Sequence, residues 1–111
     1  MRKSNDVYLK EILDYMGDIE SYLNNIKMDG FETNGLLQDG VIRKIELIGE
    51  VARKLSRDFW VSYEKELPLA KAVAMRNKMI HEYDDVDLKI IWNTVKKDLP
   101  ELKKKIKEIL R

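Results

Sequence analysis

Cysteine is absent from this chain, which excludes a disulfide scaffold, a thiol nucleophile and the common zinc clusters. Proline occurs twice and glycine five times in 111 residues, so few residues interrupt regular structure. The N-terminus lacks a signal-like apolar run, and no apolar stretch approaches the length of a membrane span. We therefore expect a helical protein that stays in the cytoplasm and does not enter a membrane.

The chain has almost no excess of charge of either sign, because its 21 basic residues are matched by 20 acidic ones and the formal net charge is +1. The overall charge therefore does not mark the chain as a nucleic-acid-binding protein. Any contact with nucleic acid has to be local, or assembled across an oligomer. The length predicts one domain over residues 1–111, small enough that a subunit partner adds much to its stability.

Apolar residues recur at spacings of three and four over most of the chain, which predicts amphipathic helices. The expected helices cover residues 4–28, 36–56, 69–82 and 88 onward, with Ser4 or Asn5 as the first cap and Asp29-Gly30 closing the first helix. Residues 57–68 lack a clean period and are expected to form an irregular connection with room for a short turn of helix. Pro100 should kink or restart the last helix near Leu99. The fold class is all-α.

The chain's only histidine, His81, follows Arg76 by five residues within a stretch that also holds Asn77 and Tyr83. On a helix these four polar groups share one broad face, which we expect to meet solvent or a partner. An arginine can hold a scissile phosphate bidentately, and a histidine can move protons at the ribose 2′-hydroxyl or the leaving oxygen. The pattern therefore suits RNA cleavage without a metal or cofactor.

Such a reaction needs an acid and a base, and one histidine per chain supplies only one of them. A two-fold homodimer that places both copies of the face across a cleft supplies the second imidazole and a second Arg76 charge. The same residues also fit a structural interpretation, in which an ion-pairing arginine and a histidine lie near a helix end. A metal site of His81 with neighbouring carboxylates is disfavoured, because the ligand spacing is wrong.

At this stretch the sequence resembles the HEPN superfamily, and specifically the HepT toxins of HepT/MntA toxin–antitoxin systems. Their motif of Arg, four residues, His, one residue and Tyr is matched by Arg76, His81 and Tyr83, with Asn77 after the arginine. The similarity extends over most of the chain, through Ile48-Gly49-Glu50 and through residues 86–100. One departure is Leu69 after Pro68, where relatives often carry tryptophan.

The resemblance implies a four- to five-helix antiparallel bundle that dimerises through the motif helix. It implies a toxic, metal-independent endoribonuclease in which Arg76 and His81 are catalytic and Asn77 supports them. It also implies an MntA-like nucleotidyltransferase antitoxin that uses ATP to transfer AMP to Tyr83. Glu50 either projects into the cleft or is a solvated or ion-paired surface residue.

A noncatalytic alternative remains open: a helical dimer that binds a nucleotide or a partner protein through the same cleft. A purely structural bundle is a third possibility. The lysines of the last helix are most simply its solvated face.

Overall fold

The computed structural model describes residues 3–67, 70, 73–74, 76 and 87–111, and over these residues the chain is helical with no strand. The all-α prediction is therefore confirmed. In chain order the helices are α1 (Asn5–Tyr22), α2 (Met28–Glu32), α3 (Gly35–Ala52), α4 (Arg57–Tyr63), α6 (Leu88–Asn93), the π-helical segment η2 (Thr94–Asp98) and α7 (Leu99–Leu110).

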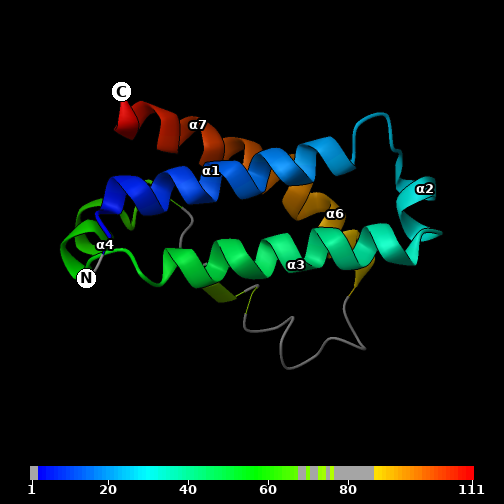
Figure 1. Ribbon diagram of the computed structural model, residues 1–111, viewed down its shortest axis with the longest axis horizontal. Coiled ribbons are helices and arrows are strands. Elements are labelled where there is room, and N and C mark those ends of the chain that lie inside the picture. The colour runs from blue at the N-terminus through cyan, green and yellow to red at the C-terminus, as the bar shows by residue number, and fades with distance from the viewer. Residues whose placement is uncertain (1–2, 68–69, 71–72, 75, 77–86) are drawn as a thin grey trace.

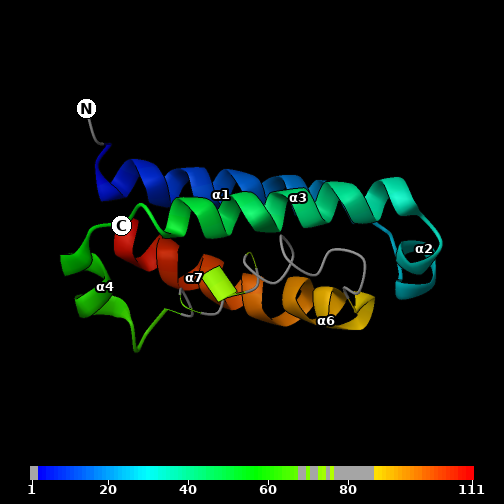
Figure 2. The same cartoon turned by 90° about the horizontal axis from the view of Figure 1, so that it is seen from below.

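Two long helices, α1 and α3, lie side by side and run in opposite directions along the length of the molecule (Figure 1). A second layer made of α6, η2 and α7 covers one face of this pair, as the turned view shows (Figure 2). Within that layer α7 packs along α1. The short helices α2 and α4 lie at opposite ends of the molecule (Figures 1 and 2).

Apolar side chains at helical spacing build one continuous core between these layers. In α1 the buried stripe is Leu9, Ile12, Met16 and Ile19, each no more than 2% exposed, as the periodicity predicted. Phe31 of α2 is fully buried, and its ring centroid lies 5.5 Å from that of Trp92. The core thus joins both layers and the α2 end. Its other members include Ile45, Ile48, Leu67, Ile91, Leu99, Leu102 and Ile106.

The predicted first helix was too long. Ser4 does cap α1, because its Oγ accepts a hydrogen bond from the Val7 N–H at 3.3 Å. The helix ends at Tyr22, however, and Asn25 three residues later has φ of 63°, in the left-handed region where a right-handed helix cannot continue. Asp29-Gly30 is not a stop signal here, since both residues lie inside α2.

The second helix is also shorter than predicted, and the connection after it is more regular. Helix α3 ends at Ala52, and Ser56 caps α4 by accepting from the Phe59 N–H at 3.1 Å. Asn5 fixes this corner, since its Nδ2 donates to Ser56 Oγ and its Oδ1 accepts from the Ser56 N–H, both at 2.9 Å. The short turn of helix allowed for residues 57–68 is thus a seven-residue helix over Arg57–Tyr63, because capping by Ser56 starts a helix there.

The C-terminal region confirms the predicted break near Leu99. Asp87 caps α6 by accepting from the Lys89 N–H at 2.8 Å. The backbone then widens into η2, and α7 begins at Leu99 with Pro100 in its first turn. Proline has no N–H to donate to the preceding turn. A change in the hydrogen-bond pattern just before Pro100, from the π-helical segment to a new α-helix, fits this missing donor.

Most of the predicted third helix, residues 69–82, lies outside the described residues. The described ones, Ala70, Val73, Ala74 and Arg76, are helical. Within the described part of the chain, no helix combines the length and the apolar character needed to cross a bilayer.

Candidate functional site

The outer side of α3 carries a stripe of charged residues opposite its buried face. Arg43, Glu46 and Glu50 recur at spacings of three and four, which places them on one side of the helix. Ile45 and Ile48 alternate with them and point into the core, where each is at most 2% exposed. The amphipathic pattern of α3 therefore orients the charged stripe as a consequence of burying the apolar one.

Arg76, the first residue of the predicted catalytic motif, meets this stripe. Its Nη2 lies 3.7 Å from Glu50 Oε1, and its side chain is 21% exposed. The sequence suggested that the polar face of this segment meets solvent or a partner. In the structure the guanidinium of Arg76 lies beside α3 of its own chain and is still partly exposed. Glu50 is ion-paired, and a position at the edge of a dimer cleft stays a prediction.

Arg43 lies near the same carboxylate oxygen. Its Nη1 lies 3.9 Å from Glu50 Oε1 and 3.2 Å from Glu46 Oε2, with which it forms a hydrogen bond. Two guanidinium groups thus lie within 4 Å of one oxygen of Glu50. Arg43 is 58% exposed and Glu50 is 34% exposed, so solvent reaches this cluster and weakens each ion pair. Such contacts are easily exchanged for another anion.

A hollow of about 370 Å³ adjoins the cluster at the C-terminal end of α3. It is lined by Glu50, Arg53 and Lys54, so two cationic side chains follow Glu50 along the chain. Together with Arg43 and Arg76 they place several positive charges around one carboxylate. The near-neutral net charge of the chain therefore conceals a locally basic surface.

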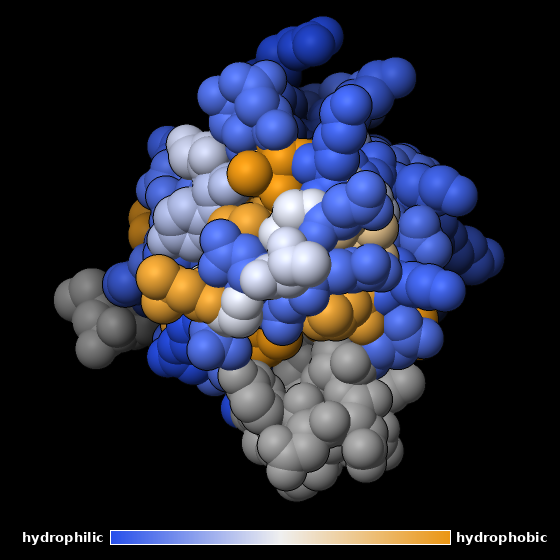
Figure 3. All heavy atoms as spheres, turned by 90° about the vertical axis from the view of Figure 1, so that its right-hand side faces the viewer, coloured by the Kyte–Doolittle hydropathy of each residue, from blue (hydrophilic) through white to orange (hydrophobic). Residues whose placement is uncertain are grey.

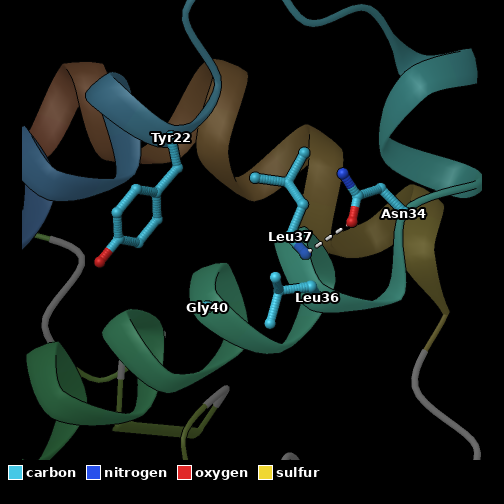
Figure 4. A pocket seen from close by; sticks show the side chains of 5 residues that line it. All are labelled: Tyr22, Asn34, Leu36, Leu37 and Gly40. Carbon is cyan, nitrogen blue, oxygen red and sulfur yellow. Dashed lines mark hydrogen bonds between the residues drawn. The ribbon is translucent and has the colours of Figure 1, made fainter.

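A second pocket, of about 350 Å³, lies at the opposite end of α3 and is lined by Tyr22, Asn34, Leu36, Leu37 and Gly40 (Figure 4). One of its polar side chains, Asn34, already has a partner within the helix it caps, since its Oδ1 accepts from the Leu37 N–H at 3.0 Å. The end of the molecule that carries α2 is mostly hydrophilic with separate hydrophobic areas among its described residues (Figure 3). About 14 residues of helix, roughly 21 Å, separate Leu36 from Glu50, so this pocket is remote from Arg76.

The structure describes Arg76 and Glu50 among the predicted site residues and brings them together. His81, Asn77 and Tyr83 lie outside the described residues. Arg43 was not identified from the sequence, although its helical spacing to Glu50 was available as a signal. Among the described residues no three His, Asp or Glu side chains converge as a metal site would require.

Comparison with known proteins gives the family. The family model described as ribonuclease HepT-like matches residues 12–109, which is most of the chain. This chain belongs to the ribonuclease HepT-like family. A protein of Thermococcus cleftensis named "Probable ribonuclease HepT" is 35% identical over 109 residues, covering 98% of each chain. The resemblance drawn from the motif is therefore confirmed at the level of the family.

Other relatives of the HepT-like chain come from Methanocaldococcus jannaschii. One, named "Gamma-glutamylcyclotransferase and putative RNase", is 41% identical over 110 residues, which are 99% of this chain and 49% of that relative. The chain thus spans about half the length of that protein. Another, named "Putative RNase", is 35% identical over 104 residues, covering 94% of this chain and 85% of the relative. No solved structure gives a significant match.

Proposed function

We propose that this chain is a metal-independent endoribonuclease in which Arg76 and His81 act on the scissile phosphodiester and Asn77 supports them. The observation that carries the proposal is the placement of Arg76: its guanidinium lies among charged side chains of α3, on a surface with several cationic groups. Membership of the HepT-like family and the names of its relatives support the same activity.

The chemistry follows from the groups involved. A guanidinium forms paired hydrogen bonds to phosphate oxygens and stabilises negative charge that develops during cleavage. The unperturbed pKa of an imidazole lies near neutral pH, so the group can both accept and donate protons. One imidazole takes a proton from the 2′-hydroxyl, and a second one gives a proton to the departing 5′-oxygen. Because each chain has one histidine, the proposal places two copies of the motif at a shared homodimer cleft, where each supplies one of these roles.

The proposal includes regulation by a partner. The chain acts as the toxin of a toxin–antitoxin pair, and an MntA-like nucleotidyltransferase neutralises it by transferring AMP from ATP to the Tyr83 hydroxyl. The phenolic oxygen attacks the α-phosphate of ATP, pyrophosphate leaves, and the tyrosine proton is released to solvent. A spacing of seven residues brings Arg76 and Tyr83 onto one side of a helix, so on that geometry the added phosphate brings negative charge near Arg76 and repels an RNA backbone.

The test is cleavage of a fluorescent RNA by purified protein in EDTA, with wild type compared with His81→Ala. We expect loss of activity by a factor of about 10²–10⁴ in the variant. Cleavage by His81→Ala at the wild-type rate shows that the catalytic assignment is wrong. Tight binding of a nucleotide or a partner protein, with no RNA cleavage by wild type, supports the noncatalytic dimer instead.

A mixed dimer tests the shared cleft. Differently tagged wild-type and His81→Ala chains are co-expressed, and the heterodimer is purified on both tags. If both imidazoles serve one reaction, the heterodimer is nearly as inactive as the homodimer that carries His81→Ala in both chains. If each chain carries an independent site, it keeps about half of the wild-type rate, and the shared cleft is wrong.

A further inference from the structure

The side chains of Arg43 and Arg76 resemble an anion-binding site in which the carboxylate of Glu50 is the bound anion. Two guanidinium nitrogens, Arg43 Nη1 and Arg76 Nη2, approach one oxygen, Glu50 Oε1, at 3.9 and 3.7 Å. Paired arginines recognise carboxylate and phosphate oxygens by the same hydrogen-bond geometry. A phosphate oxygen can therefore replace the carboxylate oxygen of Glu50 next to these two side chains.

We infer that Arg43 is a second phosphate-binding residue of the RNA site, and that Glu50 occupies this position until an RNA phosphate displaces it. The inference rests on the proposed ribonuclease function and adds a residue and a step to it. In the free protein Glu50 balances the charge of Arg43 and Arg76. In the RNA complex a backbone phosphate takes over both guanidiniums, and Glu50 rotates toward solvent.

The geometry permits the exchange. Both distances end at the same oxygen, Glu50 Oε1, so the distance between Arg43 Nη1 and Arg76 Nη2 cannot exceed their sum. Charge-assisted N–H···O bonds are roughly 2.7–2.9 Å long, so a phosphate with two oxygens toward the arginines can bridge such a gap. Neither contact of Glu50 is that short, which indicates that the carboxylate fills the space without making two strong bonds.

Exposure and surroundings favour the exchange as well. Arg43 is 58% exposed and retains Glu46 as a partner at 3.2 Å, so its side chain stays anchored when Glu50 leaves. Glu50 is 34% exposed and borders the hollow lined by Arg53 and Lys54, which gives the displaced carboxylate access to solvent and cationic neighbours. The same basic residues continue the path along which a negatively charged backbone would run.

Binding measurements separate this inference from the reaction itself. The probe is a fluorescent oligonucleotide with 2′-O-methyl riboses, which carries RNA phosphates but no 2′-hydroxyl to attack. Its affinity is followed by anisotropy over a series of salt concentrations. We expect Arg43→Gln to weaken binding about tenfold and to reduce the slope of log affinity against log salt by about one. Arg43→Lys, which keeps the charge but loses the planar fork, falls between wild type and Arg43→Gln.

Glu50→Gln is the decisive variant, because the displacement step predicts an effect of opposite sign. Removing the competing carboxylate should tighten binding several-fold at low salt and steepen the salt dependence. The matched control is Lys104→Gln, which removes one positive charge from α7, a helix that packs along α1 rather than beside the charged stripe. It should change affinity less than twofold.

Three results overturn the inference: Arg43→Gln binding like wild type, Arg43→Gln weakening binding no more than Lys104→Gln, or Glu50→Gln weakening binding. Circular dichroism and the thermal midpoint of each variant show whether it is folded. A misfolded Arg43→Gln leaves Arg43→Lys and Glu50→Gln to decide. If the Arg43 and Glu50 variants change RNA affinity as expected but the wild-type protein does not cleave RNA, only the proposed function is refuted. If the wild-type protein cleaves RNA but neither substitution changes the affinity, only this inference is refuted.

Discussion

Arg76 Nη2 lies 3.7 Å from Glu50 Oε1, so the first residue of the family motif faces a carboxylate from α3 of the same chain. Glu50 is in turn 3.9 Å from Arg43 Nη1. Both distances are longer than a charge-assisted hydrogen bond, so the carboxylate offsets the charge of the two arginines without fixing either side chain in place.

Arg76→Lys should lower the cleavage rate by about 10- to 100-fold, although the charge is kept. Lysine presents a point charge and cannot form the paired hydrogen bonds of a guanidinium to phosphate. Single-turnover cleavage of a fluorescent RNA measures the change, and Arg111→Lys, an exposed arginine that ends the chain, is the control. An Arg76→Lys rate equal to that of the control would remove Arg76 from the catalytic assignment.

Tyr83→Phe should cleave RNA like wild type but escape neutralisation. The variant lacks the hydroxyl that accepts AMP, so intact-mass measurement after incubation with the nucleotidyltransferase partner and ATP should show no added AMP. Wild type treated in parallel should gain AMP increments and lose cleavage activity. Increments that persist in Tyr83→Phe mean that another residue is the acceptor.

Phe31→Ala should destabilise the protein by about 3–5 kcal/mol, because it leaves a cavity at a fully buried position beside Trp92. Denaturant unfolding at fixed protein concentration measures the change in the free energy of unfolding. Leu36→Ala is the matched control, since Leu36 is 85% exposed and should change stability by less than about 0.5 kcal/mol. Equal effects of the two substitutions would contradict the core described here.

Gly17→Ala should stabilise the protein by roughly 0.5–1 kcal/mol. Gly17 lies inside α1, and no atom from a neighbouring element lies within 4 Å of the position its Cβ would take. Alanine restricts the unfolded chain and suits a helix better than glycine. A shift of the unfolding midpoint to lower denaturant would show that this side of α1 is closely packed in solution, for example against a second copy of the chain.

The helices were predictable where apolar spacing alone decides the structure, as in the buried stripe Leu9, Ile12, Met16 and Ile19 of α1. The ends were less predictable. Ser4 and Asp87 act as caps, as their side chains suggest. The end of α1 depends on the left-handed backbone of Asn25. Asparagine tolerates that conformation better than most residues, but the apolar spacing does not show where it is adopted.

The candidate site divides in the same way. Arg76 and His81 stand out in the sequence through their spacing and chemical type, and Glu50 through a family element. Arg43 carries no such mark, since an exposed arginine on an amphipathic helix is ordinary. It became a candidate only because its guanidinium shares an oxygen with that of Arg76.

The sequence by itself determined that the chain is helical, which faces of its helices are buried, and which family it belongs to. These properties depend on local spacing and on short motifs, both of which can be read along the chain. The tertiary structure alone decided that Arg43, Glu50 and Arg76 converge. That contact depends on how one helix packs against the residues around Arg76, and packing between segments distant in sequence is not encoded in the period of either one.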